Sequence, residues 1–239
     1  DAYRALLQSA GSYDLIVSEP SNPWVTGVEM LYSVEFLQAA RRHLAPGGVF
    51  AQWFHTYEID DATVELVLRN YASAFPYVSV WYTLSHDLVL LGFDRPDRAL
   101  DVAALEERFR RPDFEAAFAR VGIRRFPMLL AHEVLPIGIV DPEQIPGPLH
   151  TLRHPILSYG AARAFFRGGA AVLPRFAKPE SGAVGARNSL LRRYAGVDAG
   201  LLPEKLVEDA AQAACRSSRV DECATFLGLW KREHPESAQ

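Results

Sequence analysis

The stretch Tyr13–Trp24 constrains this chain most, because it joins an apolar strand pattern to a loop stiffened by two prolines. Asp14–Val17 carries branched apolar side chains and ends abruptly in polar residues, which predicts a buried strand that runs into a loop. Pro20 and Pro23 remove two backbone donors and fix the φ angle at two points of that loop. The polar residues between them are therefore held with little freedom.

The side chains of this loop favour binding of a small amine. Glu19 and Asn22 stand three residues apart and offer a carboxylate and an amide oxygen, and Trp24 adds an indole face that attracts a cation. In an open α/β sheet, ligands bind in the crevice beyond the carboxyl ends of the strands, where this loop is expected to lie. The alternative is a stiff turn in which Glu19 and Asn22 only cap the next helix.

Composition limits the classes of partner. The chain has 239 residues, is 49% hydrophobic and 23% charged, and is typical of a globular chain of one large domain or one and a half. Its formal net charge of −4 gives no reason to expect nucleic acid. No apolar run approaches the ~20 residues that a membrane span needs, and no signal peptide is visible. The chain starts at Asp1 in mid-pattern, so we expect a piece of a longer protein.

The cysteine content favours a reducing compartment. Cys215 and Cys223 are too few for a disulfide framework, and we expect them to pack between helices as small apolar side chains. His150 and His154 have the spacing of a metal pair on a helix, but Pro155 argues against a helix there and no carboxylate or thiol completes a ligand set. No metal is therefore expected.

The periodicity before residue 98 predicts four strands, near 14–18, 48–54, 77–83 and 87–93, with helices near 2–10, 28–44 and 61–71. Connections through helices imply parallel strands. The last two strands are joined by too few residues for a parallel crossover and must form an antiparallel hairpin. This order indicates an α/β fold whose Rossmann-like sheet ends in an antiparallel hairpin, the carboxyl-terminal part of a class I methyltransferase-like domain.

The pattern changes beyond Arg95-Pro96, so we predict two domains, 1–98 and 99–239. The second is a mostly helical carboxyl-terminal extension. Its four prolines between 141 and 155 predict a long irregular connection. Helices are predicted near 102–111, 113–121, 128–135, 159–167, 186–194, 203–215 and 220–234.

Three motifs in the first domain carry a family resemblance. They are Asp14-Leu-Ile-Val-Ser-Glu-Pro-Ser-Asn-Pro23, the pair Leu31-Tyr32 with Glu35-Phe36, and Leu44-Ala-Pro-Gly-Gly-Val-Phe-Ala-Gln52. In order and spacing they resemble the second half of spermidine synthases, above all the bacterial spermidine-synthase-like proteins, some of which are fused to membrane segments. The resemblance covers residues 1–95, and Thr151–Phe166 is similar to a tail segment of these relatives.

The resemblance implies roles for individual residues. In spermidine synthases an Asp-x-x-Asp pair engages the substrate amine, and its second Asp acts as the base. The same spacing here gives Glu19 and Asn22 as the candidate catalytic residues. Glu19 is expected to hold or deprotonate the amine, and Asn22 to accept a hydrogen bond from it. Gln52 falls on the family's glutamine near the amine, and Asp1 resembles its nucleotide-contacting aspartate. A tyrosine-containing loop of the family is replaced here by residues 83–87.

Two further residues are candidates because of their place in the chain rather than the resemblance. His55 and Tyr57 follow the second predicted strand, so they are expected at the same edge of the sheet as Trp24 and to line an amine pocket with it. Ordinary packing at a strand end is the alternative for both.

The implied function is aminopropyl transfer to a polyamine, as in polyamine biosynthesis, with decarboxylated S-adenosylmethionine as donor. Asn22-Pro23-Trp24 also resembles, with one proline missing, the loop of S-adenosylmethionine-dependent amino-group methyltransferases. A non-catalytic nucleotide-binding module is the third alternative, favoured by Asn22 and by the missing tyrosine loop.

The expected partners are a small-molecule amine and a nucleotide, without nucleic acid. An exposed edge of the first predicted strand would allow a homodimer. The expected location is cytoplasmic, either alone or as the cytoplasmic part of a membrane-attached protein with an amino-terminal membrane region outside this chain.

Overall fold

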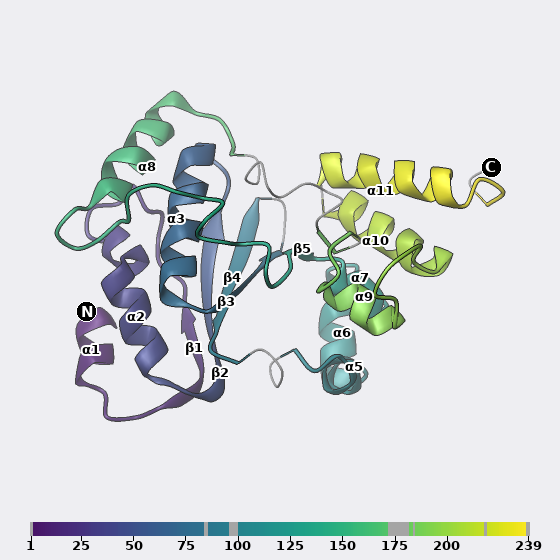
Figure 1. Ribbon diagram of the computed structural model, residues 1–239, viewed down its shortest axis with the longest axis horizontal. Coiled ribbons are helices and arrows are strands. Elements are labelled where there is room, and N and C mark those ends of the chain that lie inside the picture. The colour runs from purple at the N-terminus through teal and green to yellow at the C-terminus, as the bar shows by residue number, and fades with distance from the viewer. Residues whose placement is uncertain are drawn as a thin grey trace. The chain divides into compact units, whose positions relative to one another are not determined.

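The computed structural model describes residues 2–83, 86–95, 100–171, 182–183, 185–217 and 219–237. It is a mixed α/β protein with a five-stranded mixed sheet in the order β1-β2-β4-β3-β5 (Figure 1). The chain divides into two compact units. The first comprises Asp1–Val80, His86–Ala99 and Gly138–Phe176, and the second Trp81–Ser85, Leu100–Ile137 and Ala177–Gln239. Residues 99–239, predicted as one extension, are thus distributed over both units.

The four predicted strands are present. β1 (Tyr13–Ser18) runs parallel to β2 (Leu44–His55), as predicted, and β4 (Asp87–Phe93) runs antiparallel to β2. β3 (Tyr77–Tyr82) lies beside β4 in the sheet and is joined to it by residues 83–86. Such a link is too short for a parallel crossover, so β3 and β4 form the predicted hairpin.

One face of β2 forms the core of the first unit. Phe50 and Phe54 alternate with outward side chains along the strand and are buried. The Phe50 ring packs on Phe36 of α2 (Val34–Arg42) at 6.1 Å and on Tyr71 of α3 (Asp61–Ala74) at 6.0 Å between ring centroids. Asp60 caps α3 by accepting a hydrogen bond from the Thr63 N–H at 3.0 Å. A short amino-terminal helix, α1 (Ala2–Gln8), precedes β1.

The prediction of one helix over 28–44 is wrong. The segment forms a 3-10 turn, η1 (Glu29–Tyr32), followed by α2, with extended backbone at Ser33 between them. The Ser33 hydroxyl donates to the Met30 carbonyl at 2.7 Å and accepts from the Phe36 N–H at 3.2 Å, so it closes one helix and caps the next. Apolar spacing continued through this break and concealed it.

The region predicted as a helix at 128–135 is also different. It holds a short helix, α7 (Phe126–Leu130), and then β5 (Glu133–Leu135), a fifth strand that the sequence prediction missed. All three residues of β5 are buried, so the strand lacks the alternation that identifies a half-exposed strand.

The remaining helices match predicted segments within a few residues. The first unit contains α8 (Ile156–Arg167). The second contains α5 (Val102–Phe109), α6 (Pro112–Arg120), α9 (Leu190–Ala195), α10 (Glu204–Arg216) and α11 (Val220–Glu233). Within the described residues, no helix combines the length and the apolar character that crossing a membrane requires.

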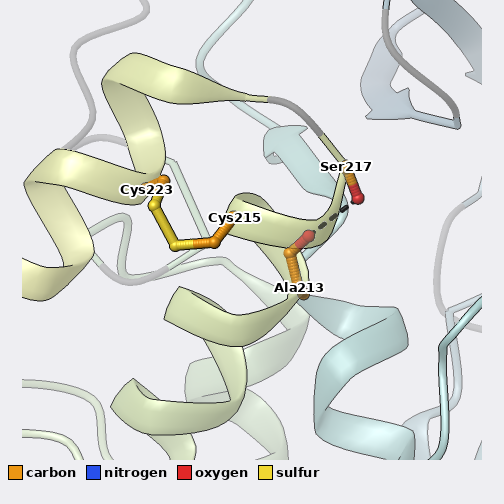
Figure 2. The surroundings of a disulfide bond; sticks show 4 residues. All are labelled: Ala213, Cys215, Ser217 and Cys223. Carbon is orange, nitrogen blue, oxygen red and sulfur yellow. Dashed lines mark hydrogen bonds between the residues drawn. A yellow bond between two sulfur atoms is a disulfide. The ribbon is translucent and has the colours of Figure 1, made fainter.

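The expectation of two reduced cysteines is wrong. Cys215 at the end of α10 and Cys223 in α11 form a disulfide (Figure 2). The turn between the two helices brings their Cα atoms to 4.7 Å, within the range that a disulfide needs. The pairing removes the argument from cysteine content for a reducing compartment.

Candidate functional site

The loop that follows β1 lies beside the end of β2. Ser18 pairs with Gln52, and both parallel strands end at the same edge of the sheet. Within the loop, Pro20 and Pro23 are buried while Glu19 is exposed. Glu19 forms no hydrogen bond or ion pair with the residues that the structure describes. Its carboxylate is therefore open to solvent and to a ligand.

Four predicted site residues come together at this edge: Asn22, Trp24, His55 and Tyr57. The Tyr57 hydroxyl donates to Asn22 Oδ1 at 3.3 Å. The Trp24 ring meets His55 edge to face at 5.1 Å and Tyr57 at 6.4 Å, and the His55 and Tyr57 rings stack at 4.2 Å. We call these four residues the aromatic cluster. Its members come from two segments some thirty residues apart in the chain.

A fourth ring that the sequence did not indicate, that of Phe165, packs against the cluster. Phe165 of α8 stacks on Trp24 with 4.9 Å between ring centroids. Beyond α8, Ala170 pairs with Tyr57, and the Ala171 N–H donates to the Thr56 carbonyl at 2.7 Å. The segment after α8 thus runs alongside residues 56–58, which no spacing in the sequence could have shown.

Burial keeps the cluster uncharged at neutral pH. His55 is fully buried, and neither ring nitrogen has a hydrogen-bond partner among the described residues. Desolvation lowers the pKa of His55 to about 4. Burial also raises the pKa of the Tyr57 hydroxyl, helped by the carboxylates of Asp87 and Glu58 and opposed by the bond to Asn22.

Glu58 and Asp87 add negative charge near the cluster, and neither was a predicted site residue. Glu58 has a φ of 53°, the only positive φ of a non-glycine among the described residues. Its N–H donates to the Gly169 carbonyl at 2.7 Å, which holds it in this left-handed conformation. Backbone strain of this kind concentrates at functional sites. The positive φ gave no signal in the sequence, because glycine usually occupies such positions.

Gln52 points away from the aromatic cluster. It is buried on the opposite face of β2 from His55, three residues along the strand. Its Nε2 donates to Ser18 Oγ at 3.2 Å and to the Leu31 carbonyl at 2.9 Å, and its Oε1 accepts from the Tyr71 hydroxyl at 2.9 Å. Gln52 therefore ties β1, η1 and α3 together beneath the loop. Asp1, predicted to contact the nucleotide, lies outside the described residues.

His150, one of the two histidines noted in the sequence, has a structural role. His150 Nε2 donates to the Glu29 carbonyl at 2.8 Å, and its Nδ1 accepts from the Leu157 N–H at 3.3 Å. Both ring nitrogens are thus used by the backbone. In the part of the chain that the structure describes, no group of three or more His, Cys, Asp or Glu side chains could hold a metal ion.

A comparison of the sequence with protein-family models gives no match, and neither does a comparison with curated proteins. The function has to be argued from the chemistry of the site itself.

Proposed function

We propose that this chain carries the amine-binding side of an aminopropyltransferase-like site, which transfers the aminopropyl group of decarboxylated S-adenosylmethionine to a polyamine. The observation that carries the proposal is the aromatic cluster with carboxylates around it. Trp24, His55 and Tyr57 stand with Asn22 at the carboxyl ends of two neighbouring parallel strands, where ligands of open α/β sheets bind.

The chemistry of the cluster suits an amine nucleophile. Transfer is an in-line displacement at a carbon next to a sulfonium, which is an excellent leaving group, so the protein has mainly to position the amine and free its lone pair. Ring faces of Trp24 and Tyr57 attract a cation. Asn22 Oδ1, held by Tyr57, keeps a second lone pair that can accept from the amine. Glu19 contributes a charge at the open side of the loop.

The sheet supports this reading of the fold. The parallel pair β1–β2 is followed by an antiparallel strand and a hairpin, which agrees with the carboxyl-terminal part of a class I methyltransferase-like domain. On that basis the nucleotide donor would lie at the same edge of the sheet, with Asp1 as a proposed contact.

The test is a transfer assay with the full-length protein. Decarboxylated and intact S-adenosylmethionine are each offered with putrescine and spermidine, and the product mass distinguishes an added aminopropyl group from an added methyl group. We expect aminopropyl transfer. Absence of any product, with a folded protein that still binds a polyamine, would overturn the proposal and favour a non-catalytic binding module.

An amino-group methyltransferase is the second candidate, because of one observation. The Tyr57 hydroxyl fixes the amide of Asn22 with its oxygen toward the cluster, beside Trp24, and an oriented amide oxygen of this kind can accept from a target nitrogen. Product carrying a methyl group from intact S-adenosylmethionine would decide for this candidate in the same assay.

A further inference from the structure

His55 on β2 and Asp87 on β4 are direct neighbours on adjacent strands. They form the last pair of the antiparallel ladder between β2 and β4. Side chains of such a pair project from the same face of the sheet, with Cβ atoms about 5 Å apart. Asp87 therefore lies on the side of β2 where His55 enters the aromatic cluster. The pairing could not be read from the sequence, because it depends on the register of β4.

The end of this ladder is held firmly. The Thr56 N–H donates to the His86 carbonyl at 2.9 Å, and Thr56 Oγ1 lies 3.2 Å from His86 Nδ1. These contacts come immediately after His55 and immediately before Asp87, so they fix the position of both residues. The strand register thus sets the backbone positions of His55 and Asp87.

The buried imidazole of His55 is energetically unfavourable in its present surroundings. Both of its ring nitrogens are buried without a partner among the described residues. An unpaired buried polar group is unfavourable, and a phenylalanine would fill the same aromatic surroundings without it. A ligand with an N–H group would satisfy the imidazole, so the unpaired nitrogens point to a molecule that binds there.

We propose that His55 and Asp87 form the proton-accepting pair of this site, with His55 as the base and Asp87 as the neighbouring charge that stabilises its protonated form. The proposal rests on the proposed function and supplies the base that the loop lacks at Asn22. His55 is the catalytic residue, because it touches the amine, and Asp87 acts through it.

The proton balance is simple. The substrate ammonium gives one N–H proton to an unprotonated ring nitrogen of His55, which becomes imidazolium. The freed lone pair on the amine forms the new C–N bond while the C–S bond breaks and its electrons leave with the sulfur. The imidazolium then passes its proton to solvent. Asp87 balances its positive charge in the interval.

The ordinary pKa values favour a histidine in this role. An alkyl-ammonium has a pKa of about 10.4, an imidazole about 6.5 and an aspartate about 3.9, so imidazole is the stronger base by more than two units. Burial opposes this by lowering the pKa of His55. Desolvation is the cause of that shift, and Asp87 does not offset it in the free protein. An opposite charge nearby favours an imidazolium, and this is the part we assign to Asp87 once the proton has been transferred.

Other titratable groups lie near His55. Tyr57 stacks on it, and Glu58 follows Tyr57 in the chain. His86, immediately before β4, lies beside Thr56. The loop after β1 contributes Trp24, which does not titrate. Only Asp87 is placed opposite His55 by the strand register.

The first test is kinetic and uses the full-length protein. His55→Phe should lower kcat by roughly 10²–10⁴, as loss of a general base does. Asp87→Asn should lower the plateau of kcat and move the acid limb of its pH profile to lower pH, because His55 loses the charge that favours its protonated form. Asp87→Glu should restore part of the kcat plateau and move the acid limb part of the way back. A variant that only distorted the structure would lower kcat without moving the acid limb of the pH profile.

The matched control is His132→Phe. His132 is another buried histidine, and desolvation lowers its pKa to about 4 as well, but its Nδ1 is 3.0 Å from the Tyr82 carbonyl, in the second unit. This variant should leave kcat and its pH profile unchanged. Full activity of folded His55→Phe, or an unmoved acid limb in Asp87→Asn, would overturn the proposal.

A second readout does not need transfer. The ring resonances of His55, assigned by their loss in His55→Phe, are followed by NMR against pH with and without putrescine. We expect putrescine to shift them and, in its presence, the pKa of His55 to be lower in Asp87→Asn than in the wild type. If the wild type transfers nothing, the proposed function fails, but these resonances still test the pair. Resonances that respond neither to putrescine nor to Asp87→Asn would refute it.

Discussion

At the scale of single residues, the proposed site separates charge from proton transfer. Glu19 is exposed and holds charge at the open side of the loop, whereas His55 is buried within the cluster. Glu19→Gln should therefore raise KM for the amine about two- to fivefold, the worth of an exposed ion pair, and leave kcat within a few-fold. Steady-state kinetics with putrescine measures both constants.

Asn22→Asp is the complementary change in the same loop. It adds a second carboxylate at the spacing found in spermidine synthases, and an aspartate can still accept from the Tyr57 hydroxyl. We expect a lower KM for the amine and transfer that begins at lower pH. Loss of kcat in Glu19→Gln as large as that in His55→Phe would contradict this division of roles and make Glu19 the base.

The buried histidines predict how stability depends on pH. The pKa values of His55 and His132 are lowered from 6.5 to about 4 by desolvation. Below pH 6.5 the unfolded chain binds protons that the native protein cannot take up until near pH 4. The free energy of unfolding therefore falls across this window, by up to about 3 kcal/mol for each histidine. His150, whose pKa burial also lowers, contributes in the same direction.

Urea unfolding at a series of pH values tests this. His55→Phe and His132→Phe should each reduce the fall in unfolding free energy between pH 6.5 and 4. At neutral pH His55→Phe should be as stable as the wild type or more stable, because it removes an unpaired imidazole. An identical pH dependence in wild type and His55→Phe would mean that the pKa of His55 is the same in the native and the unfolded state.

At the scale of elements, the disulfide has a definite expected effect. Cys215 and Cys223 close a short loop, with a sequence separation of 8, between α10 and α11. Loop-closure entropy for a loop of this size gives about 2–3 kcal/mol of stabilisation. Reduction, or the variant Cys215→Ser with Cys223→Ser, should therefore lower the unfolding free energy and weaken hydrogen-exchange protection in α10 and α11.

The double variant supplies its own control. It should not respond to a reducing agent, whereas the wild type should lose stability until it matches the variant. Equal protection of α10 and α11 in the oxidised, reduced and substituted forms would show that packing alone holds this helical hairpin.

The elements also show what sequence patterns can and cannot reveal. β1 and β4 were predicted closely because their apolar runs are bounded by turn residues. The break at Ser33 was missed because apolar spacing continues across it, and β5 because three buried residues carry no periodicity. Local pattern predicts an element, but a cap or a short buried strand is decided by tertiary contacts.

At the scale of the whole molecule, the same limit applies to the candidate site. Asn22, Trp24, His55 and Tyr57 were predictable, because parallel strands end at one edge of a sheet and their loops must meet there. Phe165 and Asp87 were not, because the first depends on where α8 lies and the second on strand register. Gln52 is the opposite case, a residue predicted near the amine that the structure turns away from the cluster. Its side chain is on the other face of β2, where it bonds to Ser18 and Tyr71.

Two strands, β1 and β5, stand at the ends of the sheet, and the exposed one, β1, gives the last prediction. Among the residues that the structure describes, β1 has only β2 beside it. Leu15 and Val17 on this strand are 57% and 66% exposed, and Tyr13 is 42% exposed. An exposed apolar strand with open backbone groups is a template for pairing with another chain. We therefore expect residues 1–239 to form dimers or larger assemblies through β1.

Sedimentation velocity over a range of concentrations measures this association. Val17→Lys places a charge on the exposed strand and should shift the protein toward monomer without changing its circular dichroism. Val220→Lys is the matched control, because Val220 is 75% exposed on α11 and far from β1 in the sequence, so its substitution should leave the association unchanged. Association that Val17→Lys and Val220→Lys reduce equally would mean that net charge governs it. A wild-type protein that stays monomeric at every concentration would mean that the exposed apolar side chains of β1 are tolerated in water.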